Sequence, residues 1–208
     1  MKVVVFDVVG TLVEPWPRVS RAYAEAGRRQ GLELVEEVIA ERFAAAWRRQ
    51  ESIDAASTPA FATNRRREIE RWRGIVDDVF EQAPASGAIF ADLWEHFARP
   101  AAWRPLAEGV QLVEEVKRAG GEVALASNFD ERLLAIARVV EPLTRADHVF
   151  VSSELGWRKP APEFFREVEQ RLGRQPEELV LVGDDPLLDI AAARNAGWQA
   201  VSVAATAV

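Results

Sequence analysis

The first candidate for chemistry is Asp7, which ends the apolar run at residues 2–6 and precedes Gly10 and Thr11. A carboxylate at the carboxyl end of a buried strand is well placed to act as a nucleophile. Glycine lets the turn bring backbone N–H groups close to an anion, and the threonine hydroxyl can bind a phosphate oxygen. The alternative is an ordinary turn or helix-capping aspartate, which this segment alone does not exclude.

Two further polar stretches contain groups suited to a phosphate. Ser127 and Asn128 directly follow an apolar run at residues 123–126. The serine hydroxyl could donate to a phosphate oxygen, although polar pairs are also common in loops. A Pro-x-Pro sequence follows Lys159 and restricts the backbone around it. Most lysines are solvated surface charges, but a fixed ammonium near Asp7 would reduce the repulsion between a carboxylate and a phosphate.

Three carboxylates occur close together at Asp184, Asp185 and Asp189, after an apolar run at residues 179–182. They repel one another unless a cation lies among them. Asp185 is expected to cap the helix that follows. Asp184 and Asp189 suit Mg²⁺, a hard cation that binds carboxylates, waters and substrate phosphates.

Predicted strands alternate with predicted helices over most of the chain, which favours an α/β fold with a parallel, doubly wound sheet. The carboxyl ends of such strands lie at one edge of the sheet, so the groups named above should meet there. Strands are expected at residues 2–6, 123–126, 148–151, 179–182 and 199–203, and helices at about 108–118, 130–138, 161–172 and 186–196.

Residues 15–105 differ from the rest, because they contain helical patterns and no convincing strand. We therefore expect a core domain formed by residues 1–14 and 106–208, and an inserted helical domain at 15–105 that covers the strand ends as a candidate lid. The helices of this insertion are expected at about 17–30, 36–49, 64–80 and 88–97.

Composition narrows the function classes. The chain has 208 residues and a formal net charge of −7, which argues against a nucleic-acid surface. It has no cysteine, and therefore no disulfide, thiolate metal site or thiol nucleophile. No stretch is apolar over ~18 residues, so we expect no membrane span, no signal peptide and a cytoplasmic protein. Its oligomeric state is open between a monomer and a homodimer.

The remaining aromatic and basic residues are expected to be structural. The seven tryptophans should lie mainly in the core and between the lid and the core. The arginine run at residues 65–67 should form a solvated helix face. His96 and His148 lie in an apolar helix and strand with no carboxylate expected beside either, so neither is assigned a catalytic role.

The order of these motifs resembles the haloacid dehalogenase superfamily, and the resemblance spans essentially the whole chain. Within this superfamily, its motifs most resemble those of the haloacid dehalogenase-like hydrolase domain-containing proteins of group three. The likeness is carried by SNFDERL at residues 127–133, SELGWRKP at 153–160 and ARNAGW at 193–198. The resemblance implies a Rossmannoid parallel core and a helical cap inserted after the first strand. It also implies hydrolysis of a small phosphorylated metabolite through an aspartyl-phosphate.

By position, the resemblance implies a role for each candidate residue. Asp7 would be the nucleophile, and Ser127 and Lys159 would hold the phosphoryl group during catalysis. The implied Mg²⁺ ligands are the carboxylates of Asp7 and Asp184 and the backbone carbonyl of Val9, with Asp189 supporting them. The implied substrate-binding groups are those of Gly10, Thr11, Ser127, Asn128 and Lys159.

Val9 departs from the phosphatase pattern, in which an aspartate at this position protonates the leaving oxygen and later activates water. Such catalysis is worth about 10²–10⁴-fold, or about 3–5 kcal/mol of barrier. Three functions stay open: a weak Mg²⁺-dependent phosphatase, a non-catalytic protein that binds phosphate or a partner, and a metal-independent 2-haloacid dehalogenase. The first is our leading prediction.

Overall fold

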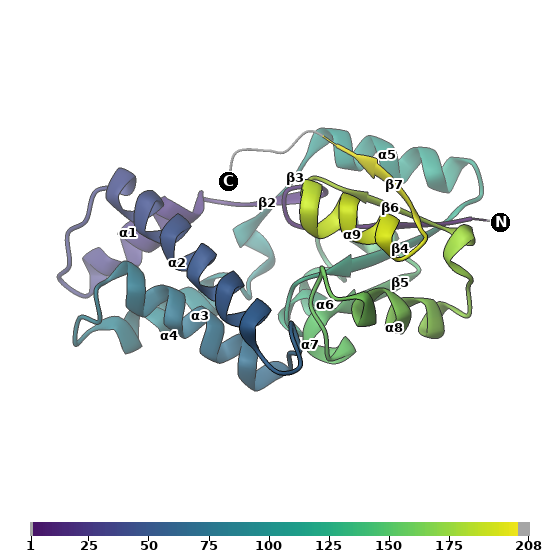
Figure 1. The fold of residues 1–208 in the computed structure, drawn as a ribbon. Helices are drawn as coiled ribbons and strands as arrows, with labels where there is room; N and C mark the ends of the chain where they lie inside the picture. Colours follow the sequence, from purple (N-terminus) through teal and green to yellow (C-terminus); the bar gives the residue numbers. More distant parts are fainter. Residues whose placement is uncertain (1, 204–208) are drawn as a thin grey trace.

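The computed structural model describes residues 2–203. Its centre is a five-stranded parallel sheet with the strand order β5-β4-β1-β6-β7 (Figure 1). The predicted α/β fold with a parallel core is therefore confirmed. The five strands are β1 (Val3–Phe6), β4 (Glu122–Ser127), β5 (His148–Val151), β6 (Leu179–Gly183) and β7 (Gln199–Ser202).

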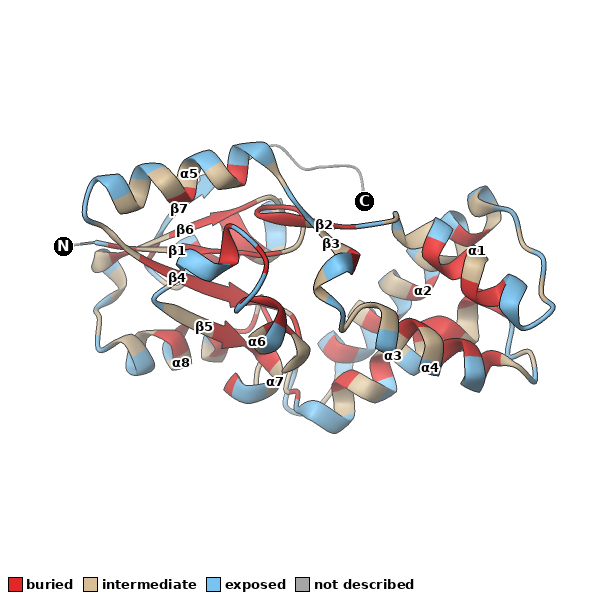
Figure 2. Cartoon of the chain, turned by 180° about the vertical axis from the view of Figure 1, so that it is seen from behind, coloured by how far each residue is buried: buried red, intermediate tan, exposed pale blue. Residues whose placement is uncertain are grey.

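Helices cover both faces of this sheet, because successive side chains of a strand point to opposite sides. Phe6 and Leu125 belong to the buried cluster on one face, and Val5 and Leu181 to the cluster on the other. Figure 2 shows β1 and β4 as buried along most of their length. The first cluster includes residues of α5 (Ala107–Arg118) and α6 (Arg132–Ile136), and the second those of α8 (Pro162–Leu172) and α9 (Ala192–Asn195).

Shorter elements complete the core. They are the helical turn α7 (Ser152–Leu155), the π-helical turn η4 (Pro186–Ala191) that leads into α9, and 3-10 turns at Leu143–Arg145 and Pro176–Glu178. The predicted helix at 186–196 is thus present as two connected pieces. The first of them begins directly after the acidic loop.

A helical insertion, which we define as α1–α4, lies beside one end of the sheet (Figure 1). It has a buried core of its own, to which Tyr23, Ile39, Ile75 and Leu93 belong. The four predicted helices are all present here, as α1 (Val19–Arg29), α2 (Glu36–Ala56), α3 (Arg65–Val79) and α4 (Ser86–His96).

One expectation for this region is wrong, because a strand does occur before residue 105. β2 (Val13–Pro15) pairs antiparallel with β3 (Trp103–Pro105) and joins the insertion to the core. A 3-10 turn at Pro100–Ala102 leads into β3. Each strand has three residues and ends in proline, so neither shows the alternation by which a strand is recognised in sequence.

Helix α2 extends seven residues beyond its predicted end at residue 49. The extension places Gln50 and Asp54 in the interior, with 6% and 1% exposure. Asp54 accepts hydrogen bonds from Arg67 and Arg71 of α3. A polar extension of this kind has no apolar period, so sequence patterning did not reveal it.

The loop between α2 and α3 makes a second contact with the core. The Thr63 N–H donates to the Gly156 carbonyl at 2.9 Å, and the Arg158 N–H donates to the Phe61 carbonyl at 3.0 Å. An antiparallel bridge joins Ala62 and Trp157 between them. The backbone of the insertion is therefore bonded to the core through this bridge as well as through the β2–β3 ribbon.

Buried charges reinforce the second contact. Arg158 of the core lies 2.6 Å from Glu68 of α3, and both side chains are at most 2% exposed. Arg71 of α3 pairs with Asp54 and with Glu51 of α2. The arginine run at 65–67 is thus only partly a solvated face, since Arg67 also joins Asp54.

None of the helices within residues 2–203 is both long and apolar enough to cross a membrane.

Candidate active site

Four predicted site residues meet at the carboxyl edge of the sheet. Asp7 follows β1, Ser127 ends β4, and Asp189 lies in the turn after β6. Lys159 arrives from the loop after α7, and its Nζ lies 2.7 Å from Asp7 Oδ1 and 2.5 Å from Asp189 Oδ1. The Ser127 hydroxyl donates to the same Asp7 oxygen at 3.2 Å. Distant stretches of chain therefore converge on the Asp7 carboxylate.

The acidic groups form a compact set. One oxygen each from Asp7, Asp184 and Asp189 lies within 4.8 Å of the others. Asp184 also accepts a hydrogen bond from the Thr11 hydroxyl at 3.0 Å, which connects the β1 turn to the β6 loop. Three oxygen donors at this spacing form a site that suits a hard divalent cation.

The turn after β1 fits closely against Asp184. Gly10 has a φ of +89°, a conformation that L side chains rarely adopt, and a Cβ there would lie 2.6 Å from Asp184 Oδ2. Val9 bridges to Val13 within the same turn. Glycine at position 10 is thus required by both the backbone conformation and the proximity of the carboxylate.

Electrostatics in this buried site are unbalanced, with three carboxylates around one ammonium. Burial raises the pKa of Asp7 to about 7, with Lys159 opposing this effect and Asp189 and Asp184 adding to it. Burial likewise raises the pKa of Asp184. Burial alone would lower the pKa of Lys159, but Asp189 and Asp7 outweigh it and raise the value above its ordinary range. The two neighbouring carboxylates therefore favour the ammonium form of Lys159.

Asn128 lines the cavity and also binds the Lys159 backbone. Its Nδ2 donates to the Lys159 carbonyl at 2.9 Å, and its Oδ1 accepts from the Lys159 N–H at 2.7 Å. These bonds fix the loop that carries the ammonium, and they leave one amide N–H and one oxygen lone pair of Asn128 for other partners. The substrate-binding role that the resemblance implies for Asn128 stays a prediction.

Asp185 and Asp189 divide two structural tasks in the acidic loop. Asp185 accepts hydrogen bonds from the N–H groups of Leu187 and Leu188, which is the capping role expected of it. Asp189 accepts from the Asp185 N–H at 3.1 Å and from Lys159. Asp189 is 2% exposed, so it faces the interior of the site.

A cavity of about 490 Å³ opens from these carboxylates into the helical insertion. Asp7, Val9, Ser127 and Lys159 line its inner end. Its wall includes four of the seven tryptophans, which were expected mainly in the core and between the lid and the core. Those four are Trp47, Trp72, Trp94 and Trp103.

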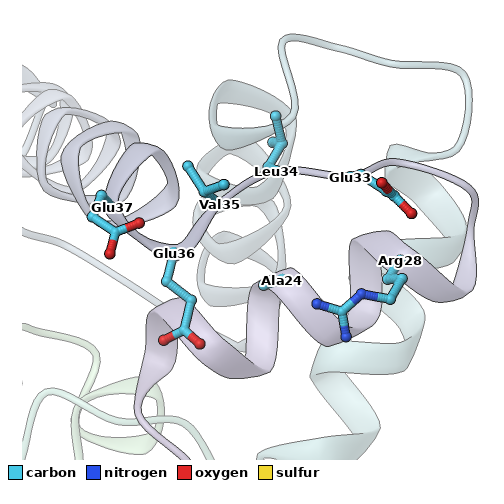
Figure 3. Close-up of a pocket in the computed structure, with 7 residues that line it drawn as sticks. All are labelled: Ala24, Arg28, Glu33, Leu34, Val35, Glu36 and Glu37. Atoms are coloured by element: carbon cyan, nitrogen blue, oxygen red, sulfur yellow. The ribbon is translucent and has the colours of Figure 1, made fainter.

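A second hollow, of about 620 Å³, lies on the outside of the insertion (Figure 3). It is lined by residues of α1, the following loop and the start of α2, including Arg28, Glu33 and Glu36. It contains none of the predicted site residues. The volume of a cavity therefore does not identify the candidate active site, because Asp7, Asp184 and Asp189 line the smaller of the two.

The structure corrects one expectation about the histidines. His148 Nε2 lies 2.7 Å from Glu122 Oε1, at the start of the neighbouring strand. The pair lies at the amino ends of β4 and β5, opposite to the edge that carries Asp7. His148 thus has a carboxylate partner that was not predicted, in a place remote from the site.

The buried charges around Arg158 escaped prediction entirely. Arg158 precedes Lys159 and joins Glu68, Asp54 and Glu51 of the insertion. The position of Arg158 directly before the predicted site residue Lys159 was the one weak indication in the sequence that Arg158 could be buried. Nothing in the sequence identified which carboxylates of the insertion would face it.

Comparison with known proteins identifies the family. A family model described as haloacid dehalogenase-like hydrolase matches residues 1–197, so the chain belongs to this family of hydrolases. The human haloacid dehalogenase-like hydrolase domain-containing protein 3 is 27% identical over 98% of this chain and 82% of its own length. A phosphoserine phosphatase of Thermus thermophilus is 31% identical over 98% of this chain and 88% of its own length.

Solved structures agree on the fold. The crystal structure of a defluorinating L-2-haloacid dehalogenase superposes with a TM-score of 0.76 at 23% identity, covering 97% of this chain and 80% of the other. A phosphatase of the same superfamily from Thermococcus onnurineus superposes with a TM-score of 0.64 at 20% identity, covering 98% and 86%. Proteins described as a dehalogenase and as a phosphatase thus share this fold, and the fold alone does not assign the reaction.

Proposed function

We propose that this hydrolase cleaves a phosphate monoester, with Asp7 as the nucleophile and Mg²⁺ as the cofactor. The observation that carries the proposal is the set of three carboxylate oxygens within 4.8 Å of one another, with Lys159 Nζ 2.7 Å from Asp7. The relatives named phosphoserine phosphatase and ribulose-1,5-bisphosphate 5-phosphatase support a phosphorylated substrate. We further propose that α1–α4 act as a cap over this site.

The residues present fit a divalent cation. Asp7, Asp184 and Asp189 supply hard oxygen donors, and Lys159 balances only one of their three charges. Asp7, Asp184 and the Val9 carbonyl would hold Mg²⁺, with Asp189 beside them. When bound, the ion would supply charge stabilisation for a phosphoryl group.

The chain's own groups account for the chemical steps. An Asp7 oxygen attacks phosphorus, and the bond from phosphorus to the leaving oxygen breaks with its electron pair on that oxygen. Water then attacks phosphorus, and Asp7 departs as a carboxylate with release of inorganic phosphate and a proton to solvent. Lys159 reduces the repulsion between the Asp7 carboxylate and the approaching anion. Thr11 and Ser127 provide hydroxyls at the same edge.

Val9 limits this chemistry, since it lines the same cavity as Asp7 and its side chain cannot transfer a proton. The leaving oxygen must take its proton from solvent. A loss of about 10²–10⁴-fold relative to an acid-assisted site is expected for poor leaving groups. The proposed enzyme is therefore slow or restricted to stable leaving anions.

The test is hydrolysis of 4-nitrophenyl phosphate with Mg²⁺ by the wild-type protein, by Asp7→Asn and by Val9→Asp. We expect measurable turnover in the wild type, none in Asp7→Asn, and inhibition by EDTA. Background rates for both the wild type and Val9→Asp would contradict the proposal and favour a non-catalytic binding protein. Release of halide from a short 2-haloacid in EDTA would instead assign dehalogenase chemistry.

A further inference from the structure

The cavity beside Asp7 has an aromatic wall on the side of the helical insertion. Of its lining residues, those that matter here are Tyr23, Phe43, Trp47, Trp72, Phe90 and Trp94. Four of them contact one another in series, with ring centroids 5.4 Å apart for Tyr23 and Phe43, 6.1 Å for Phe43 and Trp47, and 5.8 Å for Trp47 and Trp72. Phe90 and Trp94 form a separate pair, with centroids 5.5 Å apart. The insertion thus presents a connected set of rings to the space above the carboxylates.

These rings are not fully used by the core of the insertion. Phe43, Trp47, Trp72 and Trp94 are only partly buried, although they pack against that core. Their remaining surface faces a cavity of about 490 Å³, a volume typical of small-molecule sites. Apolar surface exposed in a cavity favours a ligand that brings apolar surface of its own.

The same wall offers few groups for a highly hydroxylated or charged ligand. Arg48 is its single charged side chain among the cavity residues of α1–α4, and it lies at an exposed position. Arg132 of the core also lines the cavity, but its guanidinium donates to Asp130 and to the Trp94 carbonyl. Sugar hydroxyls or a zwitterion would leave most of their hydrogen bonds unmade here.

A second observation points the same way. Val9 lines the inner end of the cavity and cannot donate a proton to a leaving oxygen. A phenolic oxygen, with a pKa of about 10 as in tyrosine, leaves as a far more stable anion than an alkyl alkoxide. An aryl ester therefore meets both the apolar wall and the missing acid.

We infer that the substrates of this site are phosphate monoesters of aromatic hydroxyl compounds, whose ring occupies the wall formed by Phe43, Trp47 and Trp72. This inference rests on the proposed function. In the reaction the bond from phosphorus to the aryl oxygen breaks, its electron pair leaves on the phenolate, and the phenolate takes a proton from solvent.

The test measures binding rather than turnover. Phenylphosphonate and methylphosphonate share the same anionic head and cannot be hydrolysed at an ester bond, so they differ here only in the ring. Isothermal titration calorimetry with Mg²⁺ should show phenylphosphonate binding at least about tenfold more tightly, from the apolar area that the ring buries. Binding of both at the same affinity would overturn the inference and leave the proposed function standing.

Substitutions in the aromatic wall test where the ring of phenylphosphonate binds. Trp72→Leu should weaken phenylphosphonate by about 2–10-fold, the range for one lost aromatic contact, and leave methylphosphonate unchanged. Trp16→Leu is the matched control, because Trp16 is 50% exposed and does not line the cavity. Phe43→Leu provides a second wall variant, and thermal melts verify folding. Equal effects of Trp72→Leu and Trp16→Leu would contradict the assigned wall.

The two proposals fail in different ways. Ring-selective binding without turnover of any phosphate ester would contradict the proposed function and, with it, the substrate assignment, and would leave an aromatic binding site. Turnover of phosphate esters without ring-selective binding would overturn only the inference. If neither phosphonate binds, the inference is wrong, and turnover of 4-nitrophenyl phosphate decides the proposed function separately.

Discussion

A single guanidinium nitrogen of Arg158 lies 2.6 and 2.8 Å from the two carboxylate oxygens of Glu68. The two residues are 90 positions apart, and both side chains are at most 2% exposed. Arg158 is followed directly by Lys159, which contacts Asp7. The same loop thus carries the attachment of the helical insertion and the positive charge of the site.

Removing one partner of this pair should destabilise the protein strongly. Glu68→Ala leaves a buried guanidinium with less compensation, and we expect a loss of about 3–5 kcal/mol in the free energy of unfolding. Glu70→Ala is the control, since Glu70 is exposed and pairs only with Arg66 four residues away, and it should cost at most about 0.5 kcal/mol. Urea unfolding measures both, and similar values for the two variants would contradict the prediction.

The same carboxylate should make stability depend on pH. Burial opposes ionisation of Glu68, but the attraction of Arg158 outweighs it, and the pKa of Glu68 lies below its ordinary value. A carboxyl with a lowered folded-state pKa contributes its full stabilisation above the unfolded pKa, about 4.3. That contribution is lost as the pH falls through the folded pKa.

The stability difference between the wild type and Glu68→Gln should therefore be constant from about pH 7 to pH 5 and shrink below about pH 4. Urea unfolding across this range gives the difference directly. A difference that shrinks near neutral pH would show that another group is responsible.

Asp184→Asn should weaken Mg²⁺ binding and raise the stability of the metal-free protein. The variant removes one of three mutually repelling carboxylates, so it should unfold at a higher temperature than the wild type in EDTA. Mg²⁺ at about 100 times its dissociation constant should stabilise the wild type by about 2.7 kcal/mol and the variant far less.

Differential scanning calorimetry with and without Mg²⁺ provides the measurement. Asp92→Asn, which alters a carboxylate paired with Arg29 on the insertion surface, should respond to Mg²⁺ as the wild type does. An equal Mg²⁺ response of Asp184→Asn would place the ion elsewhere.

Val9→Asp should change the leaving-group preference more than the general rate. An acid at this position assists a poor leaving group, so kcat/KM for phosphoserine should rise by about 10²-fold or more, and that for 4-nitrophenyl phosphate by less than tenfold, within the range for acid–base catalysis. Val9→Asn, similar in size to Val9→Asp but unable to exchange a proton, is the control. If Val9→Asn and Val9→Asp show the same ratio of kcat/KM for phosphoserine to kcat/KM for 4-nitrophenyl phosphate, the prediction is wrong.

The sequence predicted the fold well because its buried strands are strongly patterned. The apolar runs before Asp7 and Asp184 are buried on both faces of the sheet, and such runs leave a clear signal. Parallel strands then bring their carboxyl ends to one edge, which is why residues far apart in the chain could be expected to meet. The prediction needed only the order of the elements and the rule of parallel connection.

The parts that sequence did not predict depend on packing between distant side chains. The contact of Arg158 with Glu68 depends on which surfaces of the insertion and the core face each other. The contact of Asn128 with the Lys159 backbone depends on how two loops of the core pack together. The β2–β3 ribbon is too short to leave a periodic signal. The tryptophans were expected in the core and between the lid and the core, but a ring on a cavity wall and a ring in a core have the same sequence pattern, so the sequence did not show which of them line the cavity.

Attachment at two separate places restricts how molecules enter and leave. A body held at two places keeps only the rotation about the line that joins them, so the β2–β3 ribbon and the Ala62–Trp157 bridge together define the axis of any opening movement of the insertion. Any other displacement of the insertion must first break the buried contacts of Arg158 with Glu68. Where product leaves through so restricted a movement, its release is the step most exposed to slowing, even where bond cleavage itself is fast.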